Sequence, residues 1–141
     1  MSLVPLLRVV IDTDVLFEGL TKKGGAAGTL VEAWLAGQLD ACVSAEMAYE
    51  YVDVLSRKLS TARWERIKPV LGVLLSRARF VALYYKWRPI SPDPGDDHVI
   101  DSAMKAGAMV VMANLRHFRT AQDSLGLKVI TAAEAVSRMT G

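Results

Sequence analysis

Hydrophobic residues along this chain follow two spacings, which predict an alternation of strands and helices. Short continuous apolar runs are typical of strands buried in a parallel sheet. Longer segments, in which apolar residues recur every three or four positions, are typical of helices with one buried face. We predict strands over residues 6–11, 40–44, 80–84, 108–113 and 128–130, and helices over 26–38, 45–59, 62–77, 96–106 and 132–139.

The order of these elements predicts the fold class. Ser44 is suited to cap the helix that begins at residue 45, and Thr61 to cap the next one. Pro69 lies inside that second helix. Because proline has no backbone N–H to donate, we expect Pro69 to kink or split the helix. Strands that alternate with helices indicate an α/β protein, a three-layer α/β/α sandwich with a central parallel sheet of four to five strands. Residues 1–141 are expected to form a single domain.

Composition narrows the protein class. The chain is 52% hydrophobic and 23% charged, which argues against disorder. Its single cysteine, Cys42, lies in an apolar run, so an internal disulfide is impossible, and one Cys with two His cannot form a structural Cys/His zinc site. No apolar run approaches the ~20 residues of a membrane span, and the first residues do not resemble a signal peptide. We therefore expect a cytoplasmic protein with no membrane association.

Charge is distributed unevenly, although the net charge is only +2. Residues 57–88 contain nine basic residues and one acid, whereas the rest of the chain contains eight basic and fourteen acidic residues. A basic segment beside acidic regions suits a protein that binds a polyanion. The alternative is an ordinary solvated helix face.

Acidic residues follow or precede several of the predicted elements. Asp12 and Asp14 come directly after the first strand, Asp96 and Asp97 open a later helix, and Asn114 follows the strand over 108–113. Each acid alone could simply end a strand or cap a helix. Because the carboxyl ends of parallel strands meet at one edge, we expect these residues to converge there, and clustered carboxylates need a cation between them. The pattern predicts a divalent metal site for phosphodiester hydrolysis.

The same motifs resemble those of PIN-domain ribonucleases, over essentially the whole chain. The first reads Val-Val-Ile-Asp-Thr-Asp-Val-Leu and has Asp14 where the family usually has Asn or Ser. The last has Met112 where Thr is usual and His117 where Asp is common, which predicts weak or Mn²⁺-dependent activity. The four matching motifs lie at residues 9–16, 44–57, 93–100 and 111–118.

The resemblance implies a metal-dependent endoribonuclease with one or two Mg²⁺ or Mn²⁺ ions. The implied metal ligands are Asp12, Glu50 and the adjacent acids Asp96 and Asp97, between which the register is ambiguous. Asn114 completes the implied catalytic set, with Thr13 and Asp14 supporting the ligands. The residues expected to hold the RNA backbone are Arg57, Lys58, Arg63 and Arg116.

The family also includes the toxins of many toxin–antitoxin pairs, so the resemblance implies partners. We expect a small antitoxin that covers the active site, and a homodimer. Apolar residues expected to be exposed for such contacts are Leu20, Leu59 and Trp64.

Two other functions fit parts of the pattern. His117 in place of an acid favours a PIN-fold module that binds RNA or an antitoxin without turnover. The Asp12-x-Asp14 motif also resembles the nucleophile motif of haloacid-dehalogenase-type phosphatases, with Asp96 and Asp101 as late acids. Those late acids should follow a strand directly, whereas Asp96 follows a proline-broken loop, so the phosphatase ranks behind.

Overall fold

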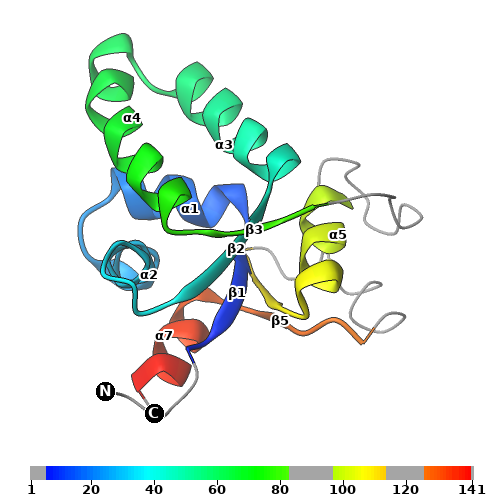
Figure 1. The fold of residues 1–141 in the computed structure, drawn as a ribbon. Coiled ribbons are helices and arrows are strands. Elements are labelled where there is room, and N and C mark those ends of the chain that lie inside the picture. The colour runs from blue at the N-terminus through cyan, green and yellow to red at the C-terminus, as the bar shows by residue number, and fades with distance from the viewer. Residues whose placement is uncertain (1–5, 83–96, 114–125, 141) are drawn as a thin grey trace.

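The computed structural model describes residues 6–82, 97–113 and 126–140, and within them the chain forms one parallel sheet with helices on both faces (Figure 1). All strand pairs are parallel, and the strand order is β3-β2-β1-β4-β5. The predicted three-layer α/β/α fold is confirmed. The strands are β1 (Arg8–Ile11), β2 (Asp40–Ser44), β3 (Arg79–Val81), β4 (Met109–Val111) and β5 (Val129–Ile130).

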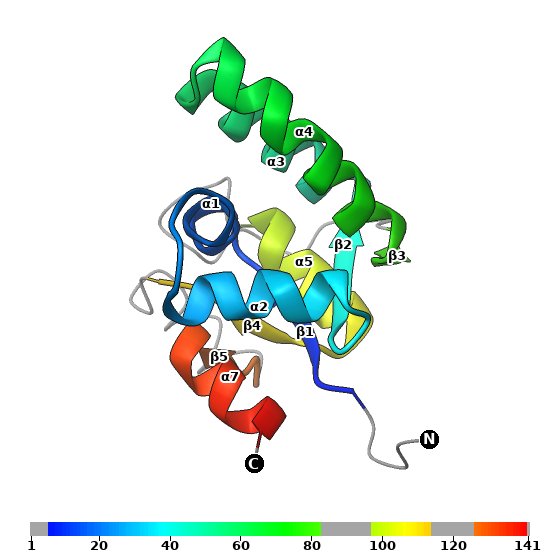
Figure 2. The same cartoon turned by 90° about the vertical axis from the view of Figure 1, so that its left-hand side faces the viewer.

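The helices divide between the two faces of the sheet. Figure 1 shows α5 on one side of the strands and α1, α2 and α7 on the other, while α3 and α4 lie side by side at the end far from both termini (Figure 2). The described helices are α1 (Thr13–Thr21), α2 (Gly25–Leu35), α3 (Ala45–Lys58), α4 (Thr61–Ser76), α5 (Asp97–Ala106) and α7 (Ala132–Thr140). None of them, within the part of the chain that the structure describes, has the length and apolar character needed to cross a membrane.

Many of the buried residues lie in the apolar runs and stripes that predicted the elements. Strand β1 is apolar and buried at its last three positions, as expected for a central strand covered on both faces. Trp34 of α2 and Tyr51 of α3 are among the largest side chains with almost no exposure. Cys42 is buried in β2, and this burial raises the pKa of its thiol to about 11, which accords with a packing role.

Besides shifts of a few residues at the ends of elements, the local structure differs from prediction in four ways. The capping residue of α4 is Ser60, whose Oγ accepts a hydrogen bond from the amide of Arg63, so the prediction of Thr61 was wrong by one position. Helix α4 also runs unbroken through Pro69, which is exposed, so water can satisfy the carbonyl that loses its partner. Strand β3 ends at Val81, whereas the prediction extended the third strand to residue 84. Helix α1 was not predicted, because the acids around Asp12 interrupt its apolar pattern.

An ion-pair cluster joins three strands at the amino edge of the sheet. Asp40 of β2 accepts a 3.0 Å hydrogen bond from Nε of Arg8 on β1 and another of 3.0 Å from Nε of Arg79 on β3. Burial by itself raises the pKa of Asp40, but the two guanidinium groups outweigh it and hold the pKa below the ordinary value of 3.8. The ionised form of Asp40 therefore stabilises the folded state.

We expect Asp40→Asn to lower the free energy of unfolding by about 1–2 kcal/mol near pH 7, because it removes two charge-assisted hydrogen bonds. Since the folded-state pKa of Asp40 lies below its unfolded-state value, this contribution is present above about pH 4 and is lost as pH falls through the folded-state pKa. Urea unfolding at descending pH should show the two proteins converging. The matched control is Asp53→Asn, which breaks the exposed Asp53–Arg57 pair and should have a much smaller effect. Equal effects of the two variants at pH 7 would contradict the prediction.

Candidate active site at the carboxyl edge of the sheet

Asp12 lies at the junction of β1 and α1, in the middle of the carboxyl edge of the sheet. Its amide donates a 2.9 Å hydrogen bond to the carbonyl of Val111, so the ends of β1 and β4 are held together here. Asp12 occupies the capping position of α1, yet its side chain makes no capping hydrogen bond, and it is only 9% exposed. The positive end of the α1 dipole stabilises a negative charge at this place.

Glu50 reaches this junction from α3. The hydroxyl of Thr13, the residue after Asp12, donates a 2.6 Å hydrogen bond to Oε2 of Glu50. Thr13 is buried and Glu50 half-buried, so the bond lies at the edge of the core. It fixes one oxygen of Glu50 beside the start of α1.

Tyr51, the next residue on α3, bonds to the residue before Asp12. Its hydroxyl donates a short hydrogen bond to the carbonyl of Ile11, and the side chain is fully buried. Burial raises the pKa of Tyr51 well above its ordinary value, and the negative charges of Asp12 and Glu50 raise it further. Two adjacent residues of α3 thus hold the residues before and after Asp12.

Helix α5 is attached to the same edge by two buried serines. Ser44, at the end of β2, caps α3 by accepting from the amide of Met47 at 3.2 Å, as predicted. Its Oγ also accepts a 2.9 Å hydrogen bond from Oγ of Ser102 on α5. The α5 backbone begins at Asp97, and the carboxyl of Asp101, one turn later, is 1% exposed. The helix that carries the third predicted acid is therefore anchored next to the helix that carries Glu50.

Several predicted site residues lie outside the described residues. Asp96, Asn114 and Arg116 are among them, as is the side chain of Asp97. Within the described ranges, no group of three His, Cys, Asp or Glu residues is close enough together to hold a metal. The described part of the site therefore consists of two carboxylates, Asp12 and Glu50, with their supporting hydroxyl groups.

Asp14 and the predicted basic residues occupy more exposed positions. Asp14 lies in the first turn of α1 and is exposed. Arg57 forms a 3.0 Å ion pair with Asp53 one turn earlier on α3, and this partner raises its pKa. Nζ of Lys58 lies 5.5 Å from the ring centroid of Phe17. Arg63 is exposed in the first turn of α4.

Sequence reasoning missed the importance of two residues. Tyr51 lies within the predicted helix over 45–59 but was not singled out there as a site residue, and Asp101 was interpreted only as a phosphatase acid. Asp101 carried a usable signal, because it is an acid flanked by Val99, Ile100 and Ala103 on the apolar side of a helix. Tyr51 carried none, because its hydrogen bond to β1 depends on how α3 packs against the sheet.

Comparison with known proteins agrees with this architecture. A family model described as a PIN domain matches residues 8–115. The fold is similar to DNA-bound VapBC from Salmonella typhimurium, which is 19% identical with a TM-score of 0.63, the match covering 90% of this chain and 99% of that one. VapBC2 from Rickettsia felis, bound to a promoter DNA fragment, is 14% identical with a TM-score of 0.62, covering 89% and 98%. FitAcB from Neisseria gonorrhoeae is 15% identical with a TM-score of 0.61, again covering 89% and 98%. Among curated protein sequences, none matches the chain.

Proposed function

The chain belongs to the PIN-domain family, and from this premise we propose that it is a metal-dependent endoribonuclease and the toxin of a toxin–antitoxin pair. The observation that carries the proposal is the arrangement around Asp12. Glu50 of α3 bonds to Thr13, which follows Asp12, and Tyr51 of α3 bonds to Ile11, which precedes it. The buried acid Asp12 is therefore held in place beside a second carboxylate. Two like charges are costly to keep together unless a cation lies between them.

The donor atoms of this site suit a small divalent cation. Carboxylate oxygens are the ligands that Mg²⁺ and Mn²⁺ prefer. Asp12 and Glu50 would hold the ion together with Asp96 or Asp97, and Asn114 would complete the set. Thr13 bonds to one carboxylate oxygen of Glu50, so the other oxygen would bind the ion. When bound, such an ion supplies Lewis acidity for the attack of water on a phosphodiester.

Exposed cations on α3 and α4 would hold the RNA backbone. Lys58 and Arg63 lie at the junction of α3 and α4, and Arg57 would exchange its ion pair with Asp53 for a phosphate. Arg116 is proposed from the sequence motif. These contacts are electrostatic, so RNA binding should weaken with added salt.

A small antitoxin is the proposed protein partner, and similarity of the fold to VapBC and FitAcB supports it. The apolar residues predicted for contacts were in part misjudged. Leu59 is only 8% exposed, and Leu20 and Trp64 are half-buried. The large apolar residues that the structure does expose include Tyr49 at 79% on α3 and Phe80 at 57% on β3. A homodimer is proposed from the family resemblance.

The test of the proposed function is RNA cleavage by the purified protein with Mn²⁺, with Mg²⁺ and with EDTA. We expect cleavage with Mn²⁺, its loss in EDTA and its return with excess Mn²⁺. Glu50→Gln keeps the acceptor for Thr13 but removes the charge, so cleavage should fall about 100-fold. Phosphate release from small monoesters with a trapped aspartyl phosphate would favour the phosphatase instead.

A binding module without turnover is the second candidate, and His117 in place of the usual acid favours it. In that case the folded protein would bind RNA or the antitoxin in a mobility-shift assay but would not cleave RNA with any divalent metal. The two candidates therefore predict different results from the same preparation.

A further inference from the structure

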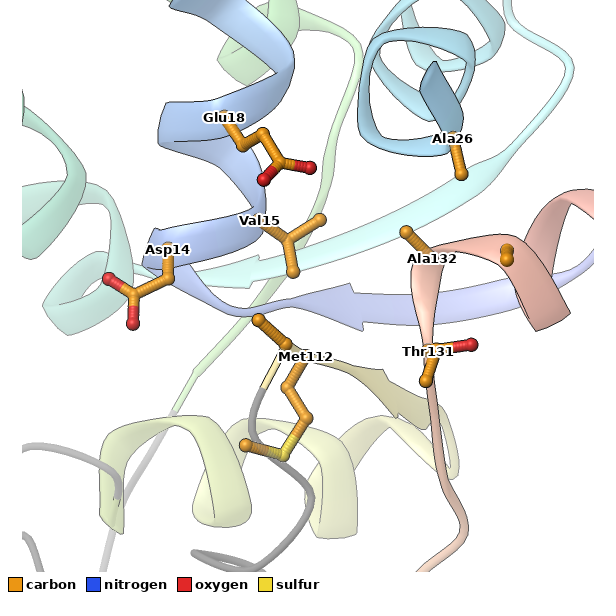
Figure 3. Close-up of a pocket in the computed structure, with 9 residues that line it drawn as sticks. Asp14, Val15, Glu18, Ala26, Met112, Thr131 and Ala132 are labelled. Carbon is orange, nitrogen blue, oxygen red and sulfur yellow. The ribbon is translucent and has the colours of Figure 1, made fainter.

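A cavity of about 240 Å³ lies beside the site, between α1, α2 and the start of α7. It is smaller than the roughly 300–1,000 Å³ of pockets for drug-sized ligands, so it suits a single ring system. Figure 3 shows that its walls come from three helices and from the loops that follow β4 and β5. Residues from each part of the wall are Val15, Glu18, Ala26, Ala113 and Ala132.

The walls of the cavity combine apolar surface with the carboxylate of one exposed residue, Glu18. Val15, Ala26 and Ala132 present methyl groups to it, and the carboxylate of Glu18 lies between them (Figure 3). Asp14 lies at the margin and points away from these methyl groups (Figure 3). A flat ring could therefore pack against the methyl groups while its edge donates hydrogen bonds to Glu18.

Hydrogen-bond donors are available where α2 begins, on the Ala26 side of the cavity. Helix α2 begins at Gly25, and its capping position, Gly24, provides no side-chain cap. The backbone amides in the first turn of α2, which includes Ala26, therefore depend on water or a ligand. The cavity thus combines an anionic acceptor with neutral donors. This combination disfavours a phosphate and suits a neutral ring that carries both N–H groups and a carbonyl oxygen.

The cavity and the carboxylates share the same two strand ends. Glu18 follows Asp12 by six positions, about 9 Å along a helix. Ala113 of the wall follows β4, which pairs with β1 through Ile11 and Val111. The separation between Asp12 and Glu18 is comparable to the distance from the phosphate of a nucleotide to its base. A base in the cavity would accordingly belong to a nucleotide next to the scissile phosphate.

We propose that this cavity binds a nucleobase of the RNA, and guanine in preference to the other three, an assignment that rests on the proposed nuclease function. Guanine presents two adjacent donors, N1–H and N2–H, which match the two oxygens of the Glu18 carboxylate. Its O6 is an acceptor for a backbone amide on the α2 side. Uracil would direct carbonyl oxygens at the carboxylate, and adenine and cytosine each pair an amino group with a ring acceptor.

The test measures binding separately from cleavage. The probes are 2′-O-methyl U-tracts that contain one G, inosine, A or C, and the readout is fluorescence anisotropy with Ca²⁺ in place of Mg²⁺ or Mn²⁺, after gel electrophoresis has shown that the probes stay intact. We expect G to bind about tenfold more tightly than A or C, with inosine between, since inosine lacks the 2-amino group. Glu18→Gln has a single acceptor oxygen, so the preference for G should fall about tenfold. Glu32→Gln, at an exposed position on α2, is the matched control and should keep the preference.

A second variant tests the cavity without changing charge. Ala132→Leu fills it from the α7 side and should abolish the preference for G while circular dichroism remains that of the wild type. If Glu18→Gln and Ala132→Leu both keep the wild-type preference, the assignment is overturned. It is equally overturned if the wild type binds all four bases alike, as it would if the cavity served a protein partner. A clear preference for G in a protein that cleaves no RNA would support guanine binding in the cavity and refute the proposed nuclease function.

Discussion

An Asp12→Asn variant is expected to fold as the wild type does and to cleave RNA about a thousandfold more slowly. The reason is that Asp12 is the buried carboxylate at the centre of the proposed metal site, between Tyr51 and Glu50. Loss of one metal-binding charge costs several kcal/mol of transition-state stabilisation, and each 1.4 kcal/mol is about tenfold in rate. Initial rates on a fluorescent RNA with Mn²⁺ measure the effect.

Thermal unfolding separates this role from a purely structural one. Without metal, Asp12→Asn relieves the repulsion between Asp12 and Glu50, so its Tm should equal or exceed that of the wild type. Added Mn²⁺ should raise the Tm of the wild type and leave that of the variant unchanged. Glu32→Gln should behave as the wild type in both assays. A variant that unfolds early but still gains stability from Mn²⁺ would show that Asp12 acts on the fold and not on the metal.

Replacing Gly19 by alanine is expected to destabilise the protein by about 1–3 kcal/mol, although alanine is the better helix former. Gly19 lies where α1 crosses α2. A Cβ there would be 2.5 Å from Cγ2 of Val31 and 2.6 Å from the carbonyl oxygen of Ala27. The side chain of Val31 could rotate away. The carbonyl of Ala27 belongs to the α2 backbone and cannot, so the two helices must separate. Urea unfolding followed by circular dichroism measures the loss.

The matched control is the same substitution at Gly72, which lies inside α4. A Cβ at Gly72 meets no other atom within 4 Å, so Gly72→Ala should stabilise the protein by up to about 1 kcal/mol through helix propensity alone. The two substitutions are therefore expected to have opposite signs. If Gly19→Ala also stabilised the protein, the close crossing of α1 and α2 would be refuted.

Elements with regular apolar patterns were predictable from the sequence. Strand 40–44 and the Ser44 cap appear in the structure as predicted, because local hydrogen bonds and a continuous apolar run determine both. Helix α1 was missed, although Val15 and Leu16 are buried in it. Asp14 in its first turn and Gly19 further along interrupt the apolar spacing that would have predicted a helix. Asp14 lies beside the proposed site, and Gly19 allows the close crossing of α1 and α2.

The sequence by itself determined the order of the strands and of the described helices other than α1, the parallel sheet and the expectation that Asp12 lies at its carboxyl edge, because those depend on local periodicity and on chain topology. Only the tertiary structure decided that Thr13 bonds to Glu50, that Tyr51 bonds to Ile11 and that Glu18 points into a cavity. These contacts join residues of different elements, and they depend on how helices pack against the sheet and against each other. Periodicity reports which face of an element is buried, but not which side chain of another element it meets.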